Sequence, residues 1–137
     1  MANADAFLGK WRLVSTEGFE DYMKELGVGV AMRKIGNMAK PDVIITKNDD
    51  TFTVKTDSTF KTSEFSFKLN EKFDENTIDG RKTQTLITLD DNNVLTQVQQ
   101  WDGKETTITR KIEDGKLIVV SRIFSDFYVK FYTINEM

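Results

Sequence analysis

Residues 95–110 read LTQVQQWDGKETTITR, and this stretch decides the fold class of the chain. Two runs rich in Val, Ile and Thr flank Asp102-Gly103, a pair that favours the positive φ angles of a tight hairpin. Similar runs follow one another from residue 42 onward, and polar turn clusters separate them mostly every ten to twelve residues. The pattern predicts an antiparallel meander of roughly ten strands, the first at Lys10–Thr16.

Side-chain alternation indicates what these strands enclose. If Trp101, Ile108 and Tyr128 face inward, the polar residues of the same parity also face inward: Gln97, Gln99, Arg110, Lys130 and Tyr132. A dry core would leave such groups uncompensated, whereas a water-filled cavity tolerates them. We therefore expect an all-β up-and-down barrel around a cavity. The opposite parity, with the polar residues facing solvent, stays open at this point.

Residues 18–38 interrupt this rhythm. Their apolar residues recur at intervals of three and four, so they line one helical face: Phe19, Tyr22, Met23 and Leu26. After Gly27 and Gly29, a second short helix is expected around Ile35 and Met38. The sequence predicts two helices that interrupt the meander.

Composition narrows the possible functions. The length of 137 residues predicts a single domain spanning 1–137. The 19 Lys and Arg against 22 Asp and Glu give a net charge of −3, and this balance predicts no basic stripe for nucleic acid. With no Cys and no His, thiolate zinc sites, cysteine nucleophiles and histidine bases are excluded. No targeting segment or apolar span is evident, so a cytoplasmic location is expected.

Catalytic and metal-binding motifs are weak. Without His, the serines cannot form a Ser-His-acid triad, and GVGVAM at 27–32 lacks the third glycine of a dinucleotide loop. The cluster Asp90–Asn93 lacks the glycine and terminal glutamate of a calcium loop and is interpreted as a solvated turn. Carboxylate pairs such as Asp74 and Glu75 have nothing that places them in a cleft. The chain is predicted to be neither an enzyme nor a cofactor or metal binder.

Several segments carry a family resemblance. GKWRL at 9–13, followed by GFEDYMKELGVG at 18–29, resembles the N-terminal signature of the intracellular lipid-binding proteins. The cytosolic fatty-acid-binding branch, close to its heart, adipocyte, epidermal and myelin members, is resembled by STFK at 58–61, FSFKL at 65–69, FDE at 73–75, DGRK at 79–82 and WDGKETT at 101–107. The likeness continues through Lys116. It implies a ten-stranded, clam-like barrel capped by a helix-turn-helix, with one long-chain fatty acid in an internal cavity.

The resemblance also implies site residues. In this branch two arginines and a tyrosine hold the ligand carboxylate; they fall on Arg110, Lys130 and Tyr132, so a lysine replaces the second arginine. A lysine lacks the planar guanidinium fork, which predicts a weaker clamp. Trp11 is interpreted as a structural closure of the barrel base. The residues expected at the cavity and portal are Phe19, Tyr22, Met23, Ile35, Met38, Phe60, Asp79, Gln97, Gln99, Ile108 and Tyr128.

Partners follow from the same reasoning. Lys24, Arg33 and Lys34 form a basic patch near the predicted cap, which favours transient contact with anionic membranes. The resemblance implies a monomeric carrier in the cytoplasm, with the nucleus as a further location. Two alternatives remain: a retinoid or other apolar-ligand binder, with an imine at Lys130, and an interaction module for membranes or proteins whose cavity is incidental.

Overall fold

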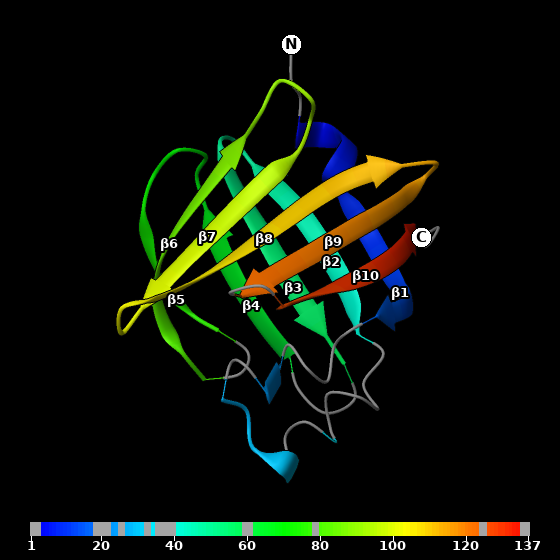
Figure 1. The fold of residues 1–137 in the computed structure, drawn as a ribbon. Coiled ribbons are helices and arrows are strands. Elements are labelled where there is room, and N and C mark those ends of the chain that lie inside the picture. The colour runs from blue at the N-terminus through cyan, green and yellow to red at the C-terminus, as the bar shows by residue number, and fades with distance from the viewer. Residues whose placement is uncertain are drawn as a thin grey trace.

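The computed structural model describes residues 4–17, 23–24, 27–31, 34, 41–58, 62–77, 80–123 and 126–134, with the side chains of 15–17, 123 and 126–134 left outside the description. A short 3-10 helix, η1 (Ala4–Phe7), precedes ten strands (Figure 1). The strands are β1 (Gly9–Glu17), β2 (Asp42–Asn48), β3 (Thr51–Asp57), β4 (Thr62–Phe67), β5 (Phe73–Asn76), β6 (Lys82–Leu89), β7 (Leu95–Trp101), β8 (Lys104–Glu113), β9 (Lys116–Ile123) and β10 (Asp126–Ile134).

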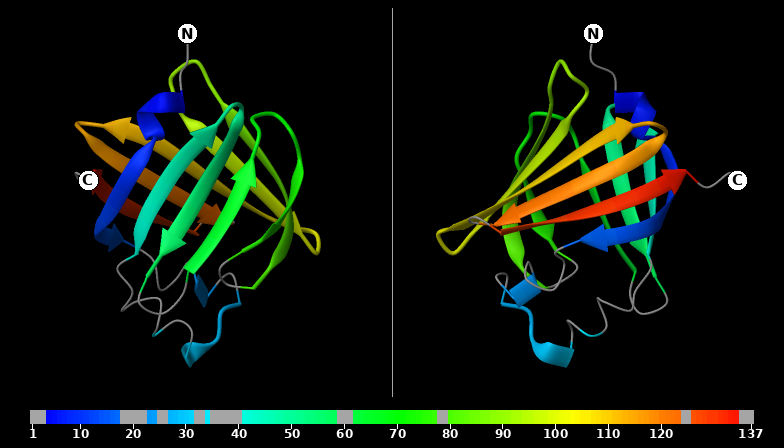
Figure 2. Two further views of the ribbon diagram at one scale, coloured as in Figure 1. Left: turned by 180° about the vertical axis from the view of Figure 1, so that it is seen from behind. Right: turned by 45° about the vertical axis from the view of Figure 1, so that its right-hand side comes forward.

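All ten strands form one antiparallel sheet in the order β4-β3-β2-β1-β10-β9-β8-β7-β6-β5. Strands that follow one another in sequence are neighbours in the sheet, except for β4 and β5, which stand at its two ends. The first and last strands, β1 and β10, pair with each other and so join the two halves of the sheet (Figures 1 and 2). The predicted meander is confirmed, and β1 extends one residue beyond the expected Lys10–Thr16 at each end.

The tight hairpin turns use the residues that the sequence indicated. Asp102 and Gly103 have φ values of 46° and 73°, and Asp114 and Gly115 have 53° and 75°. Two consecutive positive φ angles suit the right-handed twist of the strands that the turn joins. The Asp-Gly pairs therefore set the register of β7 with β8 and of β8 with β9.

Aromatic side chains bridge the gap between β4 and β5. These strands stand at the two ends of the sheet order, and no ladder joins them within the described ranges. The Phe65 and Phe73 rings stack across this gap with centroids 6.1 Å apart, and Phe67 lies 6.3 Å from Phe73. Between these two strands the described contacts are therefore aromatic and not backbone pairing.

The apolar core lies toward the end of the barrel that η1 covers. Phe7 and Trp11 are buried there, and the Trp11 Nε1–H donates to the Phe7 carbonyl at 2.9 Å. This supports the interpretation of Trp11 as a structural residue. Along the interior of β2, β3 and β4 the buried side chains form what we call the apolar wall: Val43, Ile45, Phe52, Val54 and Phe67.

The described parts of 23–34 lie beyond the opposite end of the barrel from η1 (Figures 1 and 2). Met23 is buried, and the short helical pieces at 23–24 and 30–31 occur where helices were predicted. Most of the predicted cap, 18–38, lies outside the described residues. Within the part that is described, no helix has the length and apolar character needed to cross a membrane.

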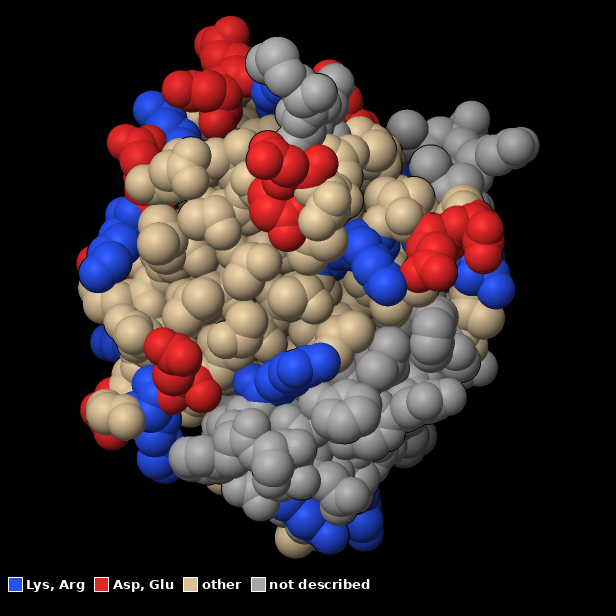
Figure 3. Space-filling model, turned by 45° about the horizontal axis from the view of Figure 1, so that its top comes forward, with Lys and Arg blue, Asp and Glu red and all other residues tan. Residues whose placement is uncertain are grey.

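Charged side chains of both signs are interspersed over the face shown in Figure 3. Uncharged side chains fill the area between them. Several of the ion pairs are exposed, such as Lys47 with Asp5 and Lys68 with Asp50, and pairs of this kind contribute little stability. The distinctive polar chemistry of this molecule lies inside the barrel.

Candidate ligand-binding site

Strands β7 and β8 turn polar side chains inward. Gln97 and Gln99 are only 1% and 2% exposed, Ile108 packs against the core, and Arg110 is half-buried. Thr96 and Thr109, of the opposite parity, pair on the outer face. The predicted inward parity is confirmed for these strands, and the alternative that these polar residues face solvent is wrong.

Arg110 is anchored by a glutamine. Its Nη1 donates to Gln97 Oε1 at 2.6 Å, and Gln97 Nε2 donates in turn to Glu75 Oε1 at 2.9 Å. A guanidinium only donates and a carboxylate only accepts, so the amide between them has one possible orientation. The contact joins the predicted carboxylate-binding arginine to a buried acid on β5.

A second branch mirrors the first. Arg81 Nη1 donates to Gln99 Oε1 at 3.2 Å, and Gln99 Nε2 donates to the same Glu75 Oε1 at 3.0 Å. The Arg81 guanidinium lies over the Trp101 ring, 4.5 Å from its centroid. Two arginines are therefore linked through two glutamines to one carboxylate.

Glu75 is the centre of this arrangement. It is 5% exposed, and its Oε1 accepts a third hydrogen bond, from Thr85 Oγ1 at 2.9 Å. Because the one hydroxyl hydrogen of Thr85 is used in this way, Thr83 must donate in its 2.7 Å contact with Thr85. We call the buried polar residues of β5, β6 and β7 the polar wall: Glu75, Thr83, Thr85, Gln97 and Gln99.

The sequence reasoning missed Glu75 and Arg81. The sequence offered no cleft in which Asp74 and Glu75 could act as a pair of carboxylates. In the structure Asp74 is exposed and accepts a hydrogen bond from Gln84 on the outer face, whereas Glu75 is buried, so the two carboxylates lie on opposite faces of β5. The missed signal is alternation: Glu75 shares the parity of Phe73, which packs against the core. Arg81 likewise shares the parity of the buried Thr83.

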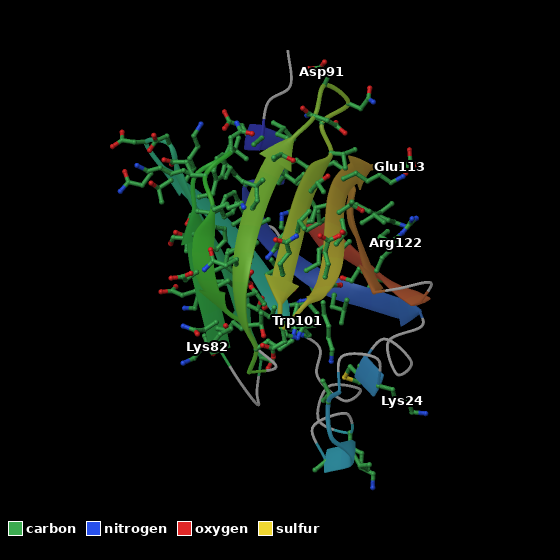
Figure 4. The ribbon with its side chains drawn as sticks, turned by 60° about the vertical axis from the view of Figure 1, so that its left-hand side comes forward. Lys24, Lys82, Asp91, Trp101, Glu113 and Arg122 are labelled. Carbon is green, nitrogen blue, oxygen red and sulfur yellow. The ribbon has the colours of Figure 1, made fainter. Side chains whose placement is uncertain are left out.

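An open hollow of about 1080 Å³ lies on the outer side of β5 to β8, where the exposed side chains of Asp74, Gln84, Gln100 and Glu105 line it. It is separate from the inward-facing polar wall. Figure 4 places Trp101 at the end of β7 nearest the segment that carries Lys24, and far from Asp91 and Glu113 at the other end of the barrel. The Arg81 branch of the network therefore lies near the cap.

The backbone register supports the expected placement of the C-terminal strand. Lys130 pairs with Val119, which also pairs with Arg110 on its other side. Directly opposed residues share a face of a sheet, so positions 110, 119 and 130 form one row. By the same logic Tyr128 is opposite buried Ser121 and Tyr132 is opposite buried Leu117. The side chains of 128, 130 and 132 are outside the description, and their predicted roles stay predictions.

The remaining predicted residues divide into two groups. Met23 is buried, whereas Lys24 and Lys34 are exposed. Those that lie outside the described residues are Phe19, Tyr22, Arg33, Ile35, Met38, Phe60 and Asp79. Their assignment to the cavity, portal or basic patch is untested by the structure.

In the described part of the chain, no group of three acidic side chains is placed to hold a metal ion. The Asp90 turn has a simpler explanation. Its Oδ1 accepts from the backbone N–H of Asn92 at 2.8 Å and of Val94 at 3.0 Å, and it is exposed. This is the solvated turn that the sequence predicted.

Comparison with known sequences points in the same direction as the geometry. Residues 8–134 match the family described as "Lipocalin / cytosolic fatty-acid binding protein family". Fatty acid-binding protein 5 of Pygoscelis papua is 71% identical over 115 residues, which cover 84% of this chain and 86% of that protein. The human protein of the same name is 59% identical over 119 residues, covering 87% of each chain.

A solved structure extends the likeness to three dimensions. A Schistosoma mansoni fatty acid binding protein in complex with arachidonic acid superposes with a TM-score of 0.93 and 33% identity. The superposition covers 97% of this chain and 98% of that one. The sheet order, the inward polar residues and these comparisons agree: this chain belongs to the lipocalin and cytosolic fatty-acid-binding protein family.

Proposed function

We propose that this chain is a non-catalytic carrier that binds one long-chain fatty acid inside the barrel. The observation that carries the proposal is the division of the interior. The apolar wall of β2 to β4 faces a polar wall of β5 to β7, and Arg110 is attached to the polar wall. The family to which this chain belongs, and its relatives named as fatty acid-binding proteins, support the same ligand class.

An amphipathic acid fits both walls. Its chain loses water against Phe52, Val54 and Phe67, which stabilises the complex by about 0.8 kcal/mol per buried methylene. Its carboxylate needs a charged partner to replace lost hydration, and Arg110 supplies a fork of N–H donors. Gln97 holds this guanidinium at the interior, so little ordering is required when the ligand arrives.

Lys130 and Tyr132 complete the proposed head-group site. The row formed by positions 110, 119 and 130 supports the placement of Lys130 two strands away from Arg110. Tyr132, opposite Leu117, lies two residues further along β10 and would add a neutral donor.

Titration of the delipidated protein with oleate by calorimetry tests this function. We expect one site per chain and competition with a fluorescent apolar probe. A stoichiometry well above one, or neither heat nor displacement, would overturn the proposal. Mass spectrometry of the denatured purified protein identifies what the cavity carries: a fatty acid supports the carrier, and a covalent adduct at Lys130 would indicate a retinal-type ligand instead.

Transient contact with anionic membranes is a second part of the proposal. Lys24 and Lys34 are exposed on the segment beyond the barrel end, and Figure 4 shows Lys24 directed away from the strands. Transfer of a fluorescent fatty acid to anionic vesicles should slow as salt rises, because salt screens such attraction. Equal rates at all salt concentrations, or equal rates for Lys24→Glu and the parent protein, would favour free diffusion.

The place of action is inferred from the family. Its description as cytosolic supports a cytoplasmic carrier. Entry into the nucleus and a monomeric state are further parts of this proposal. Fractionation of cells expressing a tagged chain and light scattering of the purified protein test them, and a purely cytoplasmic signal or a dimer mass would contradict them.

A further inference from the structure

Glu75 has a feature that the carrier function alone does not explain. Among the described residues it is the one buried side chain that carries a charge, and this charge is negative, as is that of the proposed ligand. A carrier for carboxylates thus holds an anion inside its own barrel. Its links to Arg110 through Gln97, and to Arg81 through Gln99, show which charges it balances.

In the ligand-free protein, this anion compensates the two guanidiniums. Half-buried cations have lost part of their hydration, so a fixed negative charge reached through one bridging amide lowers the free energy of the empty barrel. Glu75 is itself satisfied by three donors on Oε1, from Thr85, Gln97 and Gln99. The network is complete before any ligand enters.

In the complex, the same charge opposes the ligand. A carboxylate bound to Arg110 would be separated from Glu75 by Arg110 and Gln97. Arg110 is hydrogen-bonded to Gln97 at 2.6 Å, and Gln97 to Glu75 at 2.9 Å. Two anions then lie within about 10 Å of each other in a site of reduced dielectric, where like charges repel appreciably. An alcohol of the same chain length would not experience this repulsion.

We propose that Glu75 is an internal counter-ion that stabilises the empty carrier and weakens its hold on carboxylate ligands, which keeps binding reversible. The inference rests on the proposed function, since it assumes that an acid binds at Arg110. It makes Glu75 a specificity-determining residue that acts through charge and through the orientation of Gln97. A residue with only a structural role would not distinguish an acid from an alcohol.

The test compares Glu75→Gln with Asp74→Asn. Both variants remove one negative charge from adjacent residues, but Asp74 is exposed on the outer face and therefore serves as the matched control. Glutamine keeps the size of the side chain and one acceptor. For Glu75→Gln we expect a melting temperature about 5 °C lower without ligand, and about tenfold tighter oleate binding. Binding of oleyl alcohol should be unchanged, as should all three quantities in Asp74→Asn.

The outcomes separate the two proposals. If the parent protein fails to bind oleate, the carrier function and this inference are both overturned. If the parent binds oleate but Glu75→Gln binds it equally or more weakly, the counter-ion role alone is wrong. Equal gains for acid and alcohol would also overturn it.

A second variant covers the case in which Glu75→Gln does not fold. Combining it with Arg81→Gln removes one cation together with the anion. We expect the double variant to regain stability relative to Glu75→Gln, or to fold where the single variant does not. An additive loss of stability would contradict a charge-balancing role, because independent sites add whereas a coupled pair compensates.

Discussion

The apolar wall and the polar wall are built on the same scaffold but stabilised in different ways. On β3 and β4, Phe52 and Phe67 stack with centroids 5.3 Å apart, and Phe67 continues to the rings at the gap between β4 and β5. On β5 to β7, each buried polar side chain has a specific hydrogen-bond partner, with Glu75 at the centre. We expect the apolar wall to accept any apolar chain, and the polar wall to discriminate between charged and uncharged head groups. Affinity is therefore expected to come from one wall and head-group selectivity from the other.

Truncating the apolar wall should have the largest effect. Phe67→Ala removes a ring that contacts three other phenylalanines, so we expect a loss of about 3–5 kcal/mol in the free energy of unfolding. Urea unfolding measures it. Ser66→Ala, on the outer face of the same strand, is the control and should cost about 1 kcal/mol or less, for the bond to Thr53. A similar loss for both variants would mean that Phe67 does not support the wall.

Removing the cation attached to the polar wall should affect only the acid. For Arg110→Gln we expect oleate binding to weaken by about 1.5–3 kcal/mol, the worth of a charge-assisted hydrogen bond, with little change for oleyl alcohol. Probe displacement measures both ligands. Arg122→Gln, on an exposed residue of β9, makes the same charge change and should leave both affinities unchanged. Equal losses for acid and alcohol would assign Arg110 a structural role.

The smallest effect is expected at the position that departs from the family pattern. Lys130→Arg should tighten oleate binding by less than about 1 kcal/mol, because a guanidinium presents two aligned donors where an ammonium presents a point charge. Calorimetry of both proteins measures it, with Lys111→Arg, an exposed lysine of β8, as the control. Unchanged or weaker binding would indicate that position 130 does not contact the carboxylate.

The sheet and the two glutamines of the polar wall could be predicted from the sequence. Asp102-Gly103 fixed the hairpin, and the shared parity of Gln97, Gln99 and Trp101 indicated a polar interior. Both signals are local and depend on backbone periodicity, which few competing interactions disturb. The aromatic contacts between β4 and β5 could not be predicted, since they depend on how the two ends of the sheet approach each other.

Glu75 shows why the rest was missed. β5 has only four residues, Phe73–Asn76, so alternation has little length over which to be recognised. An acid in a polar stretch is also most often solvated. Its burial depends on three donors from β6 and β7 that the sequence does not connect to it: Thr85, Gln97 and Gln99. When several strands contribute residues to one site, these residues can be identified only once the pairing register of the strands is known.

The position of the ligand head group is the central claim, and side-chain NMR tests it most directly. The Nε–H resonance of Arg110, assigned by its loss in Arg110→Gln, should shift strongly when oleate is added and little when oleyl alcohol is added. The Arg81 resonance, on the other branch of the network, should move less than that of Arg110. Equal shifts of Arg110 with acid and alcohol, or a larger shift of Arg81 with oleate, would contradict the account.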